Sequence, residues 1–386
     1  MYSEYLDAAM TTDQLNAERK KQLSAIATIR KRDVLVFAAD LMKGGFAQIA
    51  IDYSDILPVR DQLENLSGTA LDLILETPGG SGEVAEQIIR IIRDKYEDLA
   101  VIVPGAAMSA GTIMAMAADD ILMGKTSALG PIDAQIQRNG KVFSADALLE
   151  GFEKIKKEVE STGQLNKAYI PILQAISPGE LQAAQNAQDF SRDLVQTWLA
   201  KYKFKNWKTH SSTGANVTEG DRAARAKQIA DGLCDHGEWL THGRPLRRED
   251  LERLRLRVTD YETDPQLSEA IRRYHTLLQM TLSSAVYKLF ETPTSQIFRM
   301  VNLAALQQAQ PQQAQGPQAV VMNIKCGKCG VETKVQANLG QKQPPQQGCI
   351  PYPADNTFRC PQCSQQMDLL PTRRQLEMQF RQPVVI

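Results

Sequence analysis

Two short apolar runs, each ending in a turn of small residues, constrain the fold of this chain more than any other feature. The runs are "ALDLILETP" (Ala70–Pro78) and "LAVIVPG" (Leu99–Gly105), and both have the length and the Pro-Gly endings of buried strands. Between them, the apolar residues of "GEVAEQIIRIIRDKY" recur at helical spacing. Strand, helix and strand in this order predict parallel pairing with a right-handed crossover.

Both turns are therefore expected at the carboxyl ends of parallel strands, where α/β proteins place their active sites. The first turn contains Gly79 and Gly80, and the second contains Ser109 within a small-x-Ser-x-Gly pattern. Serine becomes a nucleophile when a base takes its proton and N–H groups stabilise the oxyanion. We predict that Ser109 is the nucleophile and that the N–H groups of Gly79, Gly80 and Ala110 form the oxyanion site. The structural alternatives are a helix N-cap for Ser109 and a plain turn for the two glycines.

A third buried strand is predicted at Asp33–Asp40, whereas the pattern after residue 133 is helical. Helices are expected over 144–162, 177–204, 218–237, 247–258 and 264–291. The predicted organisation is an N-terminal helical arm (1–30), a catalytic core (31–175), a helical extension (176–305), a Gln/Pro-rich linker (306–319), a small cysteine-containing unit (320–371) and a tail (372–386).

Composition limits the class of protein. The 386 residues are 43% apolar and 23% charged with a formal net charge of -1, which argues against a generally basic nucleic-acid coat. Apolar runs are shorter than the roughly 20 residues of a membrane span, and the acidic N-terminus does not have the pattern of a signal peptide. We expect a soluble cytoplasmic protein.

Four of the six cysteines form two C-x-x-C pairs, Cys326 with Cys329 and Cys360 with Cys363. Two such pairs supply the four thiolates of a tetrahedral structural Zn²⁺ site, so we predict a zinc ribbon. A unit this small needs a metal or a comparable staple to fold. Its mild excess of basic residues permits nucleic-acid contact without requiring it, and a protein substrate or partner is equally open.

Three segments together resemble a known family: "ETPGGSGEVAEQI", "VPGAAMSAGTIMAMAADDILMGKTSALGPIDAQI" and "WLTHGRPL". They are similar to the serine dehydrogenase proteinase (SDH) family of Clp-fold serine proteases. The resemblance implies a Clp/crotonase-like α/β fold of βαβ units with outer helices, assembled as a homo-oligomer without an organic cofactor. It matches Gly79 and Gly80 to the oxyanion motif and Ser109 to the nucleophile. The order Ser…Asp…His then implies that Asp133 orients His242 as the base.

Several alternatives stay open at the level of sequence. Related peptidases use a Ser/Lys dyad, and Lys154, Lys156, Lys157 and Lys167 follow Ser109 at workable distances, although their charge pattern favours a solvated helix. Crotonase-type acyl-CoA enzymes use the same two N–H donors, and an inactive Clp-like scaffold would present the ribbon. We expect the other histidines, His210, His236 and His275, to serve surface or helix packing. The sequence has no P-loop, so an ATPase that feeds the enzyme would be a separate chain.

Overall fold

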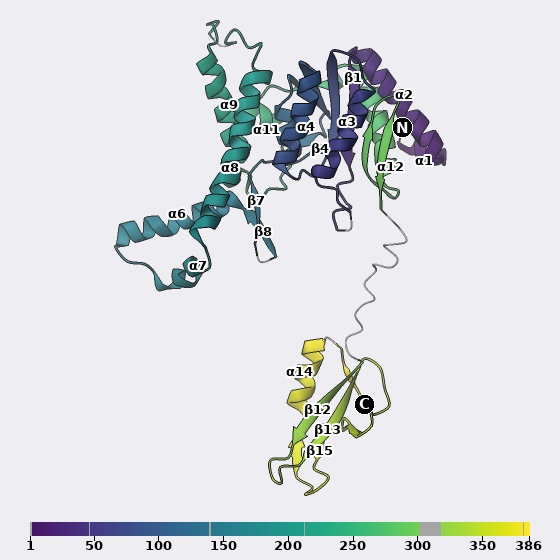
Figure 1. The fold of residues 1–386 in the computed structure, drawn as a ribbon, viewed down its shortest axis with the longest axis vertical. Coiled ribbons are helices and arrows are strands. Elements are labelled where there is room, and N and C mark those ends of the chain that lie inside the picture. Colours follow the sequence, from purple (N-terminus) through teal and green to yellow (C-terminus); the bar gives the residue numbers. More distant parts are fainter. Residues whose placement is uncertain (1, 46, 139, 212, 302–317, 381) are drawn as a thin grey trace. The chain divides into compact units, whose positions relative to one another are not determined.

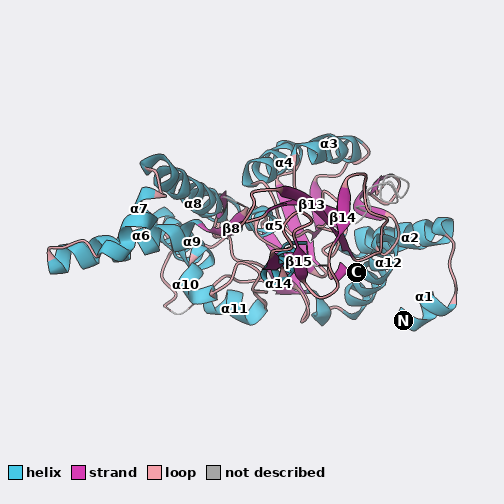
Figure 2. Ribbon diagram, turned by 90° about the horizontal axis from the view of Figure 1, so that it is seen from below, coloured by secondary structure: helices cyan, strands magenta, loops and turns pink. Residues whose placement is uncertain are grey.

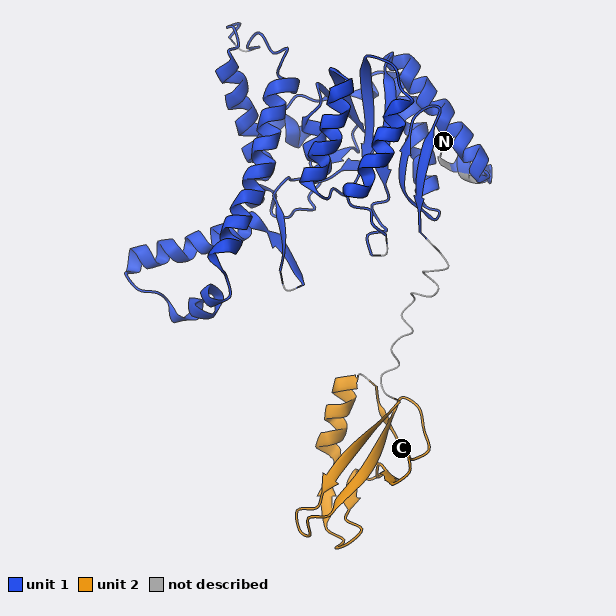
Figure 3. Ribbon diagram, viewed as in Figure 1, with its two compact units in different colours: residues 1–301 blue, residues 302–386 orange. Residues whose placement is uncertain are grey.

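The computed structural model describes residues 2–301 and 318–386, apart from residues 46, 139, 212 and 381. The chain divides into two compact units, Met1–Val301 and Asn302–Ile386 (Figure 3). Except for its last two residues, the linker predicted at 306–319 lies outside the described residues.

A seven-stranded sheet in the order β11-β10-β1-β2-β3-β5-β9 forms the centre of the first unit (Figure 1). Neighbouring strands from β1 to β9 are parallel, whereas β10 is antiparallel to β1 and β11 is antiparallel to β10. The strands are β1 (Asp33–Ala39), β2 (Ala70–Glu76), β3 (Asp98–Val103), β5 (Asp120–Met123), β9 (Thr259–Asp260), β10 (Val286–Glu291) and β11 (Gln296–Met300). The three strands predicted from sequence are confirmed as β1, β2 and β3.

Helices cover both faces of this sheet, because side chains of buried parallel strands point alternately to either side. Leu73 and Val101 pack into one hydrophobic cluster with helices α3 (Ile56–Glu64), α4 (Gly82–Lys95) and α5 (Ala110–Met116). Ile74 and Ile102 pack into a second cluster with α2 (Thr12–Arg30) and α12 (Pro265–Leu282). The fold is thus the predicted α/β class with outer helices.

The N-terminal segment begins with α1 (Tyr2–Asp7), and α2 after it buries Leu23 and Ile26 against α12 and the sheet. Arg19 on α2 forms a buried ion pair with Glu291 of β10, with 3.0 Å between Nε and Oε1. Most of the segment 1–30 is therefore held by the sheet of its own unit.

The single helix predicted over 264–291 is wrong in its last third, because the chain leaves α12 at Leu282 and enters β10 at Val286. Apolar residues keep helical spacing across this boundary, so periodicity alone favoured one long helix. Pairing with β1 prevails: Lys288 lies opposite Ala39 and Phe290 opposite Phe37. Residues 286–300 thus complete the sheet from outside the predicted core.

Short strands and further helices lie between β3 and β9 in the chain. The strands are β4 (Ala106–Ala107), β6 (Ala128–Leu129), β7 (Gln135–Arg138) and β8 (Lys141–Ser144), and β4 pairs with β6. The helices are α6 (Ala145–Thr162), α7 (Ile170–Gln174), α8 (Pro178–Trp198), α9 (Glu219–Cys234), α10 (His236–Trp239) and α11 (Arg248–Arg253). In Figures 1 and 2, α6 extends away from the sheet. None of the helices described in the structure is long and apolar enough to cross a membrane.

In its described residues, 318–380 and 382–386, the second unit is a small β structure with one helix. Strand β13 (Glu332–Leu339) lies between β12 (Ala319–Lys325) and β14 (Cys349–Pro351), and β17 (Val384–Val385) also pairs with β13. A second hairpin joins β15 (Thr357–Arg359) to β16 (Gln366–Asp368), followed by α14 (Leu370–Phe380). Leu376 and Val384 are buried in the core of this unit, so the predicted tail is part of its packing.

Candidate active site

Ser109 occupies a strained position between β4 and α5. Its backbone has φ 51° and ψ -116°, a combination that non-glycine residues rarely adopt and that costs about 1–3 kcal/mol. Strand-to-helix turns of this kind expose nucleophilic serines. Ser109 stands at the N-cap position of α5, yet among the described residues its side chain makes no capping hydrogen bond. The geometry thus favours the nucleophile over the structural alternative.

The two glycines of the first turn lie against different neighbours. A Cβ atom on Gly79 (φ +97°) would stand 2.7 Å from Ser109 Cβ and 3.1 Å from the Ala110 nitrogen. A Cβ atom on Gly80 (φ +149°) would stand 2.4 Å from the Ile51 nitrogen and 2.5 Å from its oxygen. The first turn therefore touches the second directly, and both positions require glycine.

Hydrogen bonding distinguishes the N–H groups predicted for the oxyanion site. The N–H of Gly79 donates to Thr77 Oγ1 at 3.1 Å. Within the described part of the chain, the N–H groups of Gly80 and Ala110 have no acceptor. Ala110 opens α5, so its N–H is one of the unsatisfied donors of a helix N-terminus. Gly80 and Ala110 are consequently better placed than Gly79 to bind an oxyanion.

Asp133 is buried, with its side chain 0% exposed, and it accepts hydrogen bonds from two histidines. His242 Nδ1 lies 2.7 Å from Oδ1, and His236 Nδ1 lies 3.0 Å from Oδ2. Gln135 Nε2 also donates to Oδ2 at 3.0 Å. Burial raises the pKa of the Asp133 carboxyl, but the hydrogen bonds and charge of His242, with further hydrogen bonds from His236 and Ser144, outweigh it and hold that pKa below its ordinary value.

The sequence indicates only surface or helix packing for His236, whereas the structure also places it against Asp133. His236 begins α10 directly after the end of α9, and this short helix places both His236 and His242 beside Asp133. Each imidazole uses Nδ1 for the carboxylate, so each leaves Nε2 for another partner. The signal in the sequence is the six-residue spacing of two histidines around Trp239, which alone does not indicate a shared partner.

Backbone pairing connects the segments that carry Ser109, Asp133 and His242. Strand β4, just before Ser109, pairs with β6, and Leu129 of β6 exchanges backbone hydrogen bonds of 2.7 and 2.9 Å with Leu246. In the described residues, no hydrogen bond joins the Ser109 hydroxyl to His236 or His242. The structure thus brings Asp133 together with both histidines and anchors the serine turn to a neighbouring strand.

The lysines of the alternative dyad are solvent-exposed. The Lys154 side chain is 79% exposed and lies 3.8 Å from Glu150, and the Lys156 side chain is 54% exposed and lies 3.4 Å from Glu153. Lys157 and Lys167 are also exposed. A lysine base must be desolvated to be neutral near pH 7, and these surroundings do not provide that.

The remaining two histidines pair with carboxylates other than Asp133. His275 Nε2 lies 2.8 Å from Glu76 Oε2, and His210 Nε2 lies 3.7 Å from Asp221 Oδ2. His275 is on α12 and lies with Glu76 beside Gly105, whereas His210 is in the loop before α9. The packing roles expected from the sequence stay predictions.

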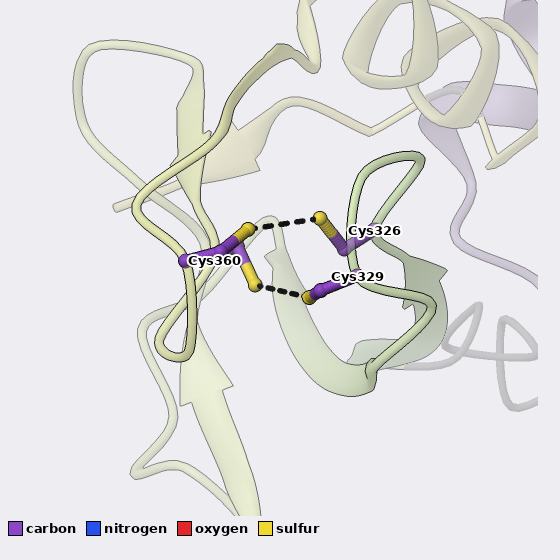
Figure 4. A group of neighbouring side chains, drawn as sticks. Cys326, Cys329 and Cys360 are labelled. Atoms are coloured by element: carbon purple, nitrogen blue, oxygen red, sulfur yellow. Dashed lines mark hydrogen bonds between the residues drawn. The ribbon is translucent and has the colours of Figure 1, made fainter.

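The second unit brings the four predicted cysteines together (Figure 4). Their sulfur atoms all lie within 4.8 Å of one another, with 3.5 Å between Cys326 and Cys363 and 3.6 Å between Cys329 and Cys360. Tetrahedral Zn–S bonds of about 2.3 Å place sulfurs roughly 3.8 Å apart, so the cluster fits a structural metal such as zinc.

The thiols of this cluster differ in acidity. Backbone N–H groups of Cys329 and Lys328 lower the pKa of the Cys326 thiol to about 6. For Cys329, the backbone N–H of Val331 favours the thiolate, but desolvation and the hydrogen bonds that the Cys329 thiol donates to neighbouring sulfurs outweigh this and raise the pKa to about 12. Four thiols this close ionise together only when a cation compensates their charge.

Comparison with known proteins shows which family and which relatives this chain resembles. The family model described as "ClpP-like SDH-type serine proteinase" matches residues 5–214. An uncharacterized protein of Methanocaldococcus jannaschii is 29% identical over 252 residues, which are 62% of this chain and 68% of that relative. A second uncharacterized protein of the same organism is 46% identical over 66 residues, which are 17% of this chain and 23% of that relative.

Two solved structures are also similar. One is a serine-to-alanine mutant of the 1510-N membrane-bound stomatin-specific protease, with 22% identity, a TM-score of 0.23, and coverage of 36% of this chain and 64% of that chain. The other is a lysine-to-alanine mutant of the same protease in complex with a substrate peptide, with 21% identity, a TM-score of 0.23, and coverage of 41% and 65%. The chain therefore spans less than two thirds of either solved chain.

Proposed function

The chain belongs to the ClpP-like SDH-type serine proteinase family, and from this membership we propose that it hydrolyses peptide bonds through an acyl-enzyme on Ser109. The observation that carries the proposal is the contact between the two turns. The strained Ser109 lies directly against Gly79, beside the N–H groups of Gly80 and Ala110, which have no acceptor among the described residues. This combination of nucleophile and donors suits acyl transfer.

In the proposed reaction, Ser109 Oγ attacks the carbonyl carbon of the scissile peptide bond while His242 Nε2 takes the hydroxyl proton. The carbonyl oxygen becomes an oxyanion that accepts hydrogen bonds from the N–H groups of Gly80 and Ala110. Collapse of this intermediate expels the amine, which receives the proton from His242. Water then attacks the ester by the same route and releases the acid. Asp133 holds the proton of His242 on Nδ1 and stabilises the imidazolium that forms.

We assign the base to His242 because its hydrogen bond to Asp133 is the shorter of the two, 2.7 Å against 3.0 Å for His236. His236 then saturates the second carboxylate oxygen and keeps Asp133 ionised. His236→Ala is the matched control for His242→Ala, since both imidazoles are similarly exposed and share one partner.

The deciding experiment combines a fluorophosphonate probe with a peptidase assay on wild type, Ser109→Ala, His242→Ala and His236→Ala. We expect labelling of wild type and none of Ser109→Ala, and a much larger loss of turnover for His242→Ala than for His236→Ala. The reverse order of the histidine variants would transfer the base role to His236. Full activity of both, with loss in Lys154→Ala, would establish the Ser/Lys dyad instead.

Absence of labelling on folded wild-type protein would refute the peptidase proposal. It would favour a crotonase-type acyl-CoA enzyme, which uses the same N–H donors without the serine, or an inactive scaffold. Thermal unfolding of each preparation separates loss of chemistry from loss of fold.

We propose that the four-cysteine cluster holds structural Zn²⁺ and that the resulting zinc ribbon recruits a protein or peptide substrate or a partner such as a separate ATPase. The clustered sulfurs support the metal. We also propose a homo-oligomer, supported by apolar side chains left exposed near α6 and α7: Val142 is 65%, Leu165 is 41% and Ile172 is 49% exposed. Sedimentation equilibrium of the full chain tests the oligomer, and a monomer at micromolar concentration would refute it.

A further inference from the structure

Lys288 on β10 is a fully buried cation whose ammonium group has three short contacts. Its side chain is 0% exposed. Its Nζ donates to Asp55 Oδ1 at 2.9 Å, to Asp55 Oδ2 at 2.7 Å and to the backbone oxygen of Ala50 at 2.6 Å. A buried pair of this kind is weak evidence for a role in stability, because desolvation offsets much of the attraction. The contact with Ala50 suggests a different role.

Two peptide units connect that contact to the oxyanion site. The C=O of Ala50 and the N–H of Ile51 belong to one planar trans peptide and point in opposite directions. The N–H of Ile51 donates to the backbone oxygen of Gly79 at 2.8 Å. The C=O of Gly79 and the N–H of Gly80 form the next such peptide. A single hydrogen-bonded chain therefore runs from the Lys288 ammonium to the N–H of Gly80.

This chain has little freedom to reorient. The N–H of Ser81 donates to the backbone oxygen of Ile51 at 3.0 Å, so Ile51 holds the peptide units on both sides of Gly80. The backbones approach so closely that a Cβ atom on Gly80 would stand within 2.9 Å of three Ile51 atoms. On the C-terminal side of Ile51, the N–H of Asp52 donates to Asp55 Oδ2 at 3.0 Å. The Lys288–Asp55 pair thus contacts both ends of the segment Ala50–Asp52, which orients the Gly80 N–H.

We propose that Lys288 is a positioning residue for the oxyanion site: through Ala50, Ile51 and Gly79 it fixes the direction of the Gly80 N–H and polarises it. The proposal rests on the proposed function, because it gives the role of donor to Gly80. Lys288 touches neither the substrate nor Ser109.

Removal of the Lys288 ammonium weakens both the orientation and the polarisation of the Gly80 N–H. In a medium of low dielectric, each hydrogen bond of a chain polarises the next by about 10–30%. Loss of one oxyanion donor costs about 10²- to 10³-fold in kcat, so a donor that is only loosened and less polarised should cost roughly tenfold. Because Asp55 neutralises Lys288 locally, the pair acts on the site through the hydrogen-bonded peptide units and not through a long-range field. The Gly80 N–H binds the oxyanion of the transition state, so we expect a change in kcat with little change in KM.

The test uses the full chain with Lys288→Met combined with Asp55→Asn. Lys288→Met alone leaves a buried carboxylate without its partner and is expected to fold poorly, whereas the double variant removes both charges and keeps an oxygen for the Asp52 N–H. The matched control is Arg19→Met combined with Glu291→Gln. It removes another buried ion pair of β10, whose hydrogen bonds do not lead to the oxyanion site.

Two readouts are measured on wild type and both double variants: kcat and KM for a peptide substrate, and the amide resonance of Gly80. The sequence contains two Gly–Gly pairs, Gly44–Gly45 and Gly79–Gly80. Protein labelled with ¹³C-carbonyl,¹⁵N-glycine therefore gives two cross-peaks in a carbonyl-to-amide correlation spectrum. Gly45→Ala identifies the peak that does not belong to Gly80.

We expect the Lys288→Met/Asp55→Asn variant to shift the Gly80 amide upfield and to lower kcat roughly tenfold, while the Arg19→Met/Glu291→Gln control leaves both near their wild-type values. An unchanged Gly80 resonance in the folded variant would overturn the proposal, whatever its activity. Equal losses of kcat in both double variants would also overturn it, because a general loss of stability would then be the cause. Wild type that neither cleaves peptides nor reacts with fluorophosphonate would refute the proposed function, and the resonance would still measure the coupling of Lys288 to Gly80.

Discussion

Asp133→Asn is the substitution that tests the assignment of the base most sharply, because it changes charge and hydrogen bonding while keeping size. In wild type, the two carboxylate oxygens accept from His242 Nδ1 at 2.7 Å and from His236 Nδ1 at 3.0 Å. An asparagine offers one oxygen and one NH₂ group in the same place. At least one imidazole then faces a donor and must hold its proton on Nε2, where it can no longer accept the proton of serine.

The expected loss follows from these contacts. A hydrogen bond to a charged group contributes about 1.5–3 kcal/mol, which is roughly 10- to 150-fold in rate at 1.36 kcal/mol per factor of ten. The wrong tautomer adds to this, and in a well-studied serine protease triad the equivalent change lowers kcat by about 10⁴-fold. We therefore expect kcat of Asp133→Asn to fall by about 10²- to 10⁴-fold. The larger end applies if the amide oxygen faces His236 and leaves the NH₂ group toward His242.

The assay is peptide hydrolysis under saturating substrate, with Gln135→Ala as the control. Gln135 Nε2 donates to the same Asp133 oxygen as His236, at 3.0 Å, but its amide is neutral and takes no part in the proton transfer. Its removal leaves the charge of Asp133 and both imidazole contacts in place, so we expect kcat to fall by less than about tenfold. If Asp133→Asn keeps kcat within about threefold of wild type while remaining folded, Asp133 does not orient the base.

Three further predictions concern the turn, the carboxylate and the cysteines. Gly80→Ala should abolish turnover and lower the melting temperature by several degrees, because the added Cβ would stand 2.4 Å from the Ile51 nitrogen. The control Gly45→Ala, whose Cβ would have no atom within 4 Å, should do neither. Equal melting curves of the two variants would contradict this prediction. Since the folded-state pKa of Asp133 is depressed, its contribution to stability is complete above the ordinary value of about 3.9 and is lost as pH falls through the folded value. Denaturant unfolding should therefore show the stability difference between wild type and Asp133→Asn shrinking below about pH 4, and a difference that grows there would refute the sign. Removal of metal by a chelator, or Cys360→Ser, should unfold residues 318–386 in hydrogen exchange and leave the first unit protected; unchanged protection would argue against a structural metal.

The parts of the fold that sequence reasoning predicts well are those specified by local pattern. The runs before Gly79 and Gly105 are short and apolar and end in Pro-Gly turns, and they form β2 and β3. The four cysteines are recognisable because ligand spacing within a knuckle is a local property. Ser109 is singled out by a local signal of the same kind, since residues 107–111 are all small except Met108, and its role as nucleophile stays a prediction.

Contacts between distant segments were not predictable in this way. Leu282, Val286 and Leu289 keep helical spacing although a strand begins at Val286, because pairing with β1 overrides local periodicity. His236 lies in a polar segment, and its partner Asp133 is 103 residues away in the sequence. The choice between Gly79 and Gly80 as oxyanion donor depends on Thr77 Oγ1 accepting from one N–H, a distinction that only the folded turn reveals.

The matched family segment, residues 5–214, contains Ser109, both glycines and Asp133, but it does not contain the groups proposed to activate and aim them. His242 follows α10, and Lys288 lies on β10, which enters the sheet beside β1. The serine turn and the oxyanion turn therefore follow β3 and β2, at the two ends of one crossover. The proposed base, His242, and the cation near Ile51, Lys288, come from segments later in the chain that pack against this crossover unit. Loss of β10 would leave Ser109 and Gly80 in the chain yet remove the buried ammonium behind Ala50. On this reasoning, the chemistry of the site depends on how residues 215–301 dock against the sheet as much as on the two turns themselves.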